Sequence, residues 1–242
     1  MPTLYTPSCQ VLYKKMKKSW LLIVIFWGLF VLFELTFAQA GATSSQFTIA
    51  RLKYSGGGDW YNDPSILPNL LTFLRENSGL DAAATEVQVS IMDESLFSYP
   101  ILFMTGHGRI AFTEREAERL RHYLTNGGFL FADDDYGMDE HFRREMSKVF
   151  PDKQLLPIPF SHFLFHNVYH FPTGAPKIHE HDGGPPQTLG YFHDGRLIVV
   201  YTFNTNISDG WADPEVHKDP PEVQQKALQM GANIFLYALM NE

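Results

Sequence analysis

The stretch YPILFMTGHGRIAFTEREAERLRHYLTNGGFLFADDD, residues 99–135, decides the fold of this chain. Its two apolar runs, 101–106 and 129–132, have the composition of fully buried strands in a parallel sheet. Between them the sequence predicts a helix that begins with a capping box, Thr113 and Glu116, and ends at Asn126-Gly127-Gly128. Strand, helix and strand in this order predict a right-handed crossover between parallel strands.

The same alternation extends in both directions from this stretch. Strand patterns occur at 47–54 and 86–92, and helix patterns at 63–77, 138–150 and 221–240. A hairpin over 190–203 turns at Asp194-Gly195. We therefore predict one α/β domain over residues 41–242, a three-layer, mostly parallel sheet with helices on both faces, plus a C-terminal β-hairpin and helix.

Residues 1–40 have the composition of a signal peptide. Four lysines precede an apolar stretch of about fourteen residues, and Ala38-Gln39-Ala40 supplies a small-x-small cleavage site. Met16 is an alternative start. The alternative to cleavage is an uncleaved anchor helix in the inner membrane, although Glu34 falls inside the apolar stretch. Both interpretations place the domain outside the cytoplasm, in the periplasm or cell envelope.

Composition limits the chemistry and the partners of the exported part. The single cysteine, Cys9, lies in the leader, so the domain has no thiol nucleophile and no disulfide. Removing four lysines and one glutamate from 19 basic and 27 acidic residues leaves 15 and 26, a net charge of −11. Such a surface repels nucleic acid and anionic lipid, so we expect neither as a partner.

The middle of the chain resembles a known family. The stretch quoted above, FRREMSKVFP (142–151) and a histidine-bearing segment at 161–166 are similar to the bacterial family called domain of unknown function 4159. The resemblance covers roughly residues 47–240, and its most specific pieces are Gly106-His107-Gly108 and the Asn-Gly-Gly-Phe entry to a strand. It implies a fold similar to the class I glutamine amidotransferase-like and flavodoxin-like group. The family implies no activity, and the amidotransferase mechanism cannot be transferred because its cysteine nucleophile is missing from this domain.

Three polar loops follow three of the predicted strands. Because parallel strands end at the same edge of a sheet, where ligands bind, we expect these loops to meet. Each loop also has a structural interpretation, since glycines permit tight turns and His107 could serve a turn. The candidate ligand-binding residues are Gly57, Asp59, Trp60, Gly106, His107, Gly108, Asp133, Asp134 and Asp135.

The three consecutive aspartates need not share one role. Side chains alternate along a strand, so Asp133 and Asp135 should face one side and Asp134 the other. One of them, Asp134 or Asp135, is expected to cap the helix that starts near Met138. The others could hold a hard cation or act as a general base.

Six of the ten histidines fall between residues 162 and 193, and three of them, His162, His166 and His170, are spaced by four. His179 and His181 add two imidazoles beside carboxylates. A His/Asp site without cysteine suits zinc or a similar divalent metal. The predicted metal ligands are His107, Asp133, His162 and His166. The alternative is that these histidines line a solvated loop or satisfy local hydrogen bonds.

These features leave two main functions open, and a purely structural accessory is a third. The first is a non-catalytic module of the cell envelope that binds a small molecule or an envelope protein in a polar cleft. The second is a metal-dependent, hydrolase-type enzyme that uses the same cleft. No nucleophile motif such as GxSxG is present, so catalytic residues are not assigned and binding is favoured. Trp211, in the polar loop 204–221, could stack on a sugar or be buried to pin the loop.

Overall fold

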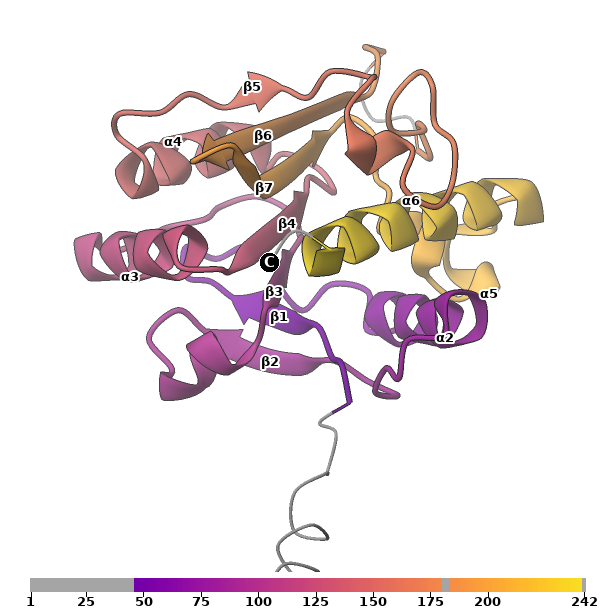
Figure 1. Cartoon of the computed structure of the whole chain (residues 1–242), viewed down its shortest axis with the longest axis horizontal. Coiled ribbons are helices and arrows are strands. Elements are labelled where there is room, and N and C mark those ends of the chain that lie inside the picture. The colour runs from indigo at the N-terminus through magenta and orange to yellow at the C-terminus, as the bar shows by residue number, and fades with distance from the viewer. Residues whose placement is uncertain (1–45, 180–182, 241–242) are drawn as a thin grey trace, which may run out of the picture. The chain divides into compact units, whose positions relative to one another are not determined.

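The computed structural model describes residues 46–179 and 183–240. Within them, one sheet has the strand order β2-β1-β3-β4-β7-β6-β5 (Figure 1). The first five strands in this order, β2, β1, β3, β4 and β7, are parallel to one another. At the end of the sheet, β6 pairs antiparallel with β7, and β5 pairs antiparallel with β6. The strands are β1 (Ala50–Lys53), β2 (Val87–Ser90), β3 (Ile101–Met104), β4 (Phe129–Asp133), β5 (Leu156–Pro157), β6 (Gln187–His193) and β7 (Arg196–Phe203).

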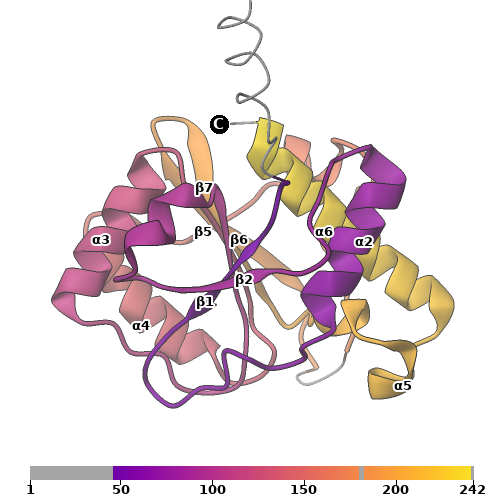
Figure 2. The ribbon, with the colours of Figure 1, turned by 90° about the horizontal axis from the view of Figure 1, so that it is seen from below.

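Helices cover both faces of this sheet. Seen along the sheet, α3 and α4 lie on one face and α2 and α6 on the other (Figure 2). The helices are α2 (Ile66–Ser78), α3 (Glu114–Thr125), α4 (Asp139–Val149), the short α5 (Pro214–His217) and α6 (Pro221–Met240); the 3-10 turns are η1 (Glu94–Ser98), η2 (Phe163–Phe165) and η3 (Asp209–Trp211).

Each face of the sheet has its own apolar core, because neighbouring side chains of a strand point to opposite faces. Phe103 and Phe131 pack in the core beneath α2 and α6, whereas Leu102 and Leu130 pack in the core beneath α3 and α4. Side chains that point alternately to the two faces of β3 and β4 thus allow a layer of helices to pack on each face of the sheet. The α/β, three-layer fold predicted from the sequence is confirmed.

The expected capping box of α3 is present, with Thr113 and Glu116 bonded to each other's backbone. The main differences from prediction concern the ends of elements and their connections. The first helix begins at Ile66, a few residues later than its Asp63-Pro64 signal suggested. The hairpin is not an appendage, because its second strand, β7, joins β4 and extends the parallel part of the sheet. The two-residue β5 carries too little pattern to be seen in the sequence.

No helix formed by residues 46–179 or 183–240 is long and apolar enough to cross a membrane. The predicted leader, residues 1–40, lies outside the described residues.

Trp211 is buried and holds the loop after β7 against the domain. Only 1% of the residue is exposed, and its indole Nε1 donates to the carbonyl of Ala227 at 2.8 Å. A side chain at Gly231 would lie 2.7 Å from the ring, so glycine lets α6 approach it closely. The loop-pinning interpretation of Trp211 is confirmed, and stacking on an external sugar is wrong.

We predict that Trp211→Phe lowers the free energy of unfolding by about 1–3 kcal/mol, because it removes a buried hydrogen bond and leaves a small cavity. Denaturant unfolding followed by circular dichroism measures this loss. Trp60→Phe is the matched control, since Trp60 is only partly buried, and it should cost less than about 0.5 kcal/mol. Equal losses in the two variants would contradict the pinning role.

Candidate functional site

The three polar loops meet at the carboxyl edge of the sheet. Asp59 follows β1, His107 follows β3 and Asp135 follows β4, and the His107 side chain contacts the carboxylates of both aspartates. The meeting point lies beside β1 and β3, the neighbouring strands at which the strand order reverses direction. Ligands of doubly wound sheets bind at such points. We call Asp59, His107 and Asp135, with Asn62 and Asn206, the His107 group.

Glycines allow the first two loops to pack directly on each other. A Cβ on Gly58 would lie 2.8 Å from the carbonyl oxygens of His107 and Arg109, and the N–H of Gly58 donates to the carbonyl of Arg109. Gly106 has φ +133°, and a Cβ there would lie 2.5 Å from the Tyr54 hydroxyl. The glycines thus have a structural role, since they bring Asp59 within reach of His107.

His107 is held by carboxylates on both ring nitrogens. Its Nδ1 lies 3.0 Å from Asp59 Oδ2, its Nε2 lies 3.2 Å from Asp135 Oδ2, and its backbone N–H donates to Asp59 Oδ1. Burial lowers the pKa of His107, but the charges of Asp135 and Asp59 outweigh that effect and leave its pKa above the usual value. With 47% of the side chain exposed, the ring is fixed in orientation yet accessible.

Asp135 is the buried member of the group. Its side chain is 4% exposed and accepts hydrogen bonds from the amide groups of Asn62 at 2.5 Å and Asn206 at 3.1 Å. Burial and the nearby charge of Asp209 raise the pKa of Asp135 to about 7, against the opposing effect of His107. A carboxyl group with this pKa beside an imidazole can give or take a proton near neutral pH.

The other two aspartates of the triplet have structural roles. Asp133 is fully buried and accepts hydrogen bonds from Thr202, Thr205 and Ser208. Asp134 accepts from the backbone N–H of Met138 at 2.9 Å, just before α4, and from the Tyr201 hydroxyl. Burial raises the pKa of each carboxyl group to about 6. The expected alternation and the expected cap are both present, and Asp134 supplies the cap.

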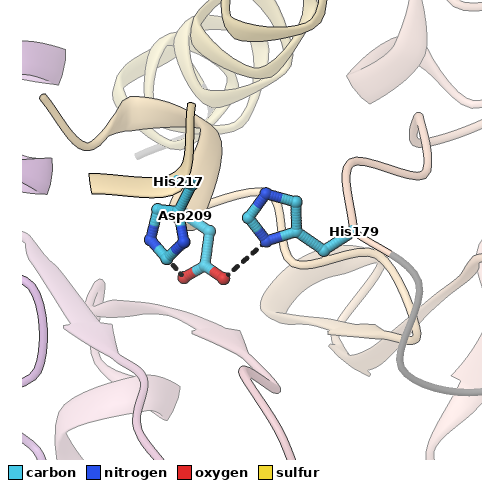
Figure 3. A group of neighbouring side chains, drawn as sticks. All are labelled: His179, Asp209 and His217. Carbon is cyan, nitrogen blue, oxygen red and sulfur yellow. Dashed lines mark hydrogen bonds and ion pairs between the residues drawn. The ribbon is translucent and has the colours of Figure 1, made fainter. Parts of the chain in front are cut away.

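A second polar cluster lies next to the first. In the part of the chain that the structure describes, one set of three His, Cys, Asp or Glu side chains brings possible ligand atoms within 4.8 Å of one another, and it consists of His179, Asp209 and His217 (Figure 3). We call these residues the His179 group. Asn206 connects the two groups, because its amide contacts both Asp135 and Asp209.

Carboxylates surround both imidazoles of this group. His179 Nδ1 lies 2.9 Å from Asp209 Oδ2, and its Nε2 lies 2.9 Å from Asp219 Oδ1. His217 Nε2 lies 3.1 Å from Asp63 and 3.9 Å from Asp209. Hydrogen bonding to Asp209, then to Asp219, raises the pKa of His179 to about 9 despite burial. Burial raises the pKa of Asp209, but hydrogen bonds from His179 and Asn206 and both imidazole charges leave it below its usual value.

The predicted metal set, His107, Asp133, His162 and His166, is not assembled. His162 packs on Tyr237 and Phe192, near the amino-terminal ends of β4 and β7, whereas Asp133 ends β4. Its Nδ1 accepts from the N–H of Leu164, so it caps η2. His166 instead contacts His170 at 2.9 Å and the carbonyl of Phe160.

Sequence reasoning singled out part of the second cluster but did not assemble it. The neighbouring carboxylates pointed to His179, and Asp209 lies in the polar loop 204–221 that carries Trp211, but nothing in the sequence pairs the two residues across thirty positions. The available signal for His217 was its position in a loop rich in aspartate. His181 lies outside the described residues.

The chain belongs to the family described as domain of unknown function (DUF4159), whose model matches residues 48–239. The resemblance seen in the sequence is therefore confirmed, whereas the implied similarity to flavodoxin-like proteins stays a prediction. No curated protein matches the sequence significantly.

We predict that the free energy of unfolding falls as pH rises from about 4 to 7. Asp133, Asp134 and Asp135 have raised pKa values, so the folded protein keeps protons that the unfolded chain has already lost. Each of the three carboxyl groups contributes about 2–3 kcal/mol to the expected decrease between pH 4.5 and 7.5. Denaturant unfolding at each pH, with chelator present, measures it.

Asp135→Asn should make this pH dependence shallower, because it removes one of the three titrating groups. Asp194→Asn is the control, since Asp194 is exposed on the hairpin turn and should leave the slope unchanged. Stability that rises over this pH range in the parent protein would contradict the prediction.

Proposed function

We propose that this chain is an exported protein of the cell envelope whose domain binds a small ligand in a polar cleft at the carboxyl edge of the sheet, centred on His107. The observation that carries the proposal is the state of the His107 ring. Its side chain is 47% exposed, and Asp59 and Asp135 orient the ring through its two nitrogens. Because the two aspartates already satisfy the His107 ring and fix its orientation, the group is preorganised at the sheet edge, which suits ligand binding.

The charges around His107 indicate the class of ligand. Both charged partners of this ring among the described residues are carboxylates, and Asp133 and Asp209 lie close enough to influence Asp135. Carboxylates repel phosphate and other anions and accept hydrogen bonds from amines and hydroxyls. The ligand class that fits is therefore a small amine or an amino sugar, rather than a nucleotide. An envelope protein that offers a lysine side chain is the alternative partner.

A second candidate function, a metal-dependent enzyme of the hydrolase type, has one specific observation in its favour. Asp135 has a pKa near 7 beside His107, which suits general acid–base catalysis. Against it, no activated nucleophile lies in the His107 group. A ligand recovered unchanged after incubation supports binding, whereas turnover supports the enzyme.

We predict that spermidine or glucosamine binds the protein and that Asp59→Asn weakens this binding about 10–100-fold, because Asp59 is the more exposed of the two carboxylates beside His107 and is the charged acceptor for an amine. Chemical-shift changes of the histidine ring protons and isothermal titration measure binding. Inorganic phosphate is the anionic control and should not bind. His122→Gln changes an exposed histidine near the end of α3 and should leave binding unchanged. Amine binding that survives Asp59→Asn would contradict the assignment.

Export is proposed from the sequence of residues 1–40, and it is tested separately. In a bacterial host, we predict that the mature chain begins at Gly41, as mass spectrometry of the purified protein would show. Ala40→Arg should block cleavage and retain the full-length chain in the membrane fraction. A full-length parent protein in that fraction would instead support the uncleaved anchor, and one in the cytosol would contradict export.

A further inference from the structure

We propose that His179, Asp209 and His217 bind a divalent transition-metal ion through one imidazole nitrogen of each histidine and the carboxylate of Asp209. The three residues come from different segments: His179 lies in the loop that precedes β6, Asp209 in η3 and His217 at the end of α5. Their side chains point toward one another (Figure 3). This site goes beyond the proposed ligand site, because it uses none of the side chains that hold His107.

The distances suit a metal centre after small side-chain movements. The possible ligand atoms lie within 4.8 Å of one another, and the shortest pair, His179 Nδ1 and Asp209 Oδ2, is 2.9 Å apart. Ligands at 2.0–2.1 Å from a tetrahedral zinc ion are roughly 3.3 Å apart. The observed separations bracket that value. Asp63 lies 3.1 Å from His217 Nε2, on the edge of the group.

The surrounding groups resemble the outer shell of a metal site. If His179 binds through Nδ1, its Nε2 is left to donate to Asp219, which lies 2.9 Å away. Metal-binding histidines usually donate their other ring N–H to a carboxylate in this way. Asp209 is buried, accepts a hydrogen bond from Asn206 and lies two residues before the pinned Trp211. The carboxylate is thus held by the core rather than by a flexible loop.

A bound dication is compatible with the charge of the cluster. Three carboxylates, Asp63, Asp209 and Asp219, face the two imidazoles of the group. Even with both imidazoles protonated, the cluster carries one net negative charge, and with both neutral it carries three. A dication bound to neutral imidazoles returns the net charge to minus one while replacing two protons.

The donor set indicates the kind of metal. Two imidazoles and one carboxylate are ligands of zinc and of other divalent transition metals, whereas calcium and magnesium prefer oxygen ligands alone. We therefore expect zinc and cobalt to bind and calcium to bind far more weakly.

The test is a zinc titration of the full chain, purified without a histidine tag and treated with chelator. We expect one zinc ion per chain by isothermal titration. Cobalt bound in its place should give a visible absorption band. Asp209→Asn and His217→Gln should each weaken zinc binding about 100-fold or more, and Asp219→Ala about 10–100-fold. Asp219→Glu should recover most of the loss if Asp219 acts by positioning His179.

His166→Gln is the matched control. His166 and His170 form a second pair of neighbouring histidines, which is the competing candidate for zinc binding. It should leave zinc affinity unchanged, as should His107→Ala, which separates this site from the ligand site. Circular dichroism verifies that each variant is folded, and His217→Gln, at a residue 26% exposed, is the safer of the two ligand variants. Zinc binding that survives both ligand variants, or that disappears in His166→Gln, would overturn the proposal, as would no binding at all.

Discussion

The buried carboxylate of Asp133 is the interaction on which the polar edge depends. It ends β4 in the interior of the domain, where it accepts hydrogen bonds from Thr202 and Thr205 and from the backbone and hydroxyl of Ser208. These bonds join the end of β4 to the chain that leaves β7. A buried carboxylate needs such donors, because an unsatisfied one would be costly. The loop that carries Asn206 and Asp209 is consequently fixed beside the exits of β3 and β4.

Much of the fold and one of the two polar groups could be predicted from the sequence. Apolar runs at 101–106 and 129–132, with a capped helix between them, specify a parallel arrangement, and a parallel arrangement places the strand exits at one edge. That reasoning needs only local sequence patterns and the rule that parallel strands end at the same edge of a sheet. It brought Asp59, His107 and Asp135 together, and strand alternation separated Asp134 from its two neighbours.

The rest could not be predicted, because it depends on loops that meet without a repeating pattern. His179, Asp209 and His217 approach one another only after the chain between β7 and α6 folds back on Trp211. The regular spacing of His162, His166 and His170 instead drew attention to residues that make local contacts, such as the cap of η2. Periodicity reports which side chains share a face, but not which distant segment that face will contact.

The hairpin turn between β6 and β7 has a practical consequence. Asp194 and Gly195 adopt positive φ angles there, and the Asp194 side chain is 91% exposed. Since β7 runs from this turn towards the edge that carries Asp133, the turn lies at the far end of the sheet. Exposed tips of this kind tolerate insertions. A fluorophore or an immobilisation handle could be attached at this tip, leaving the opposite rim facing solution.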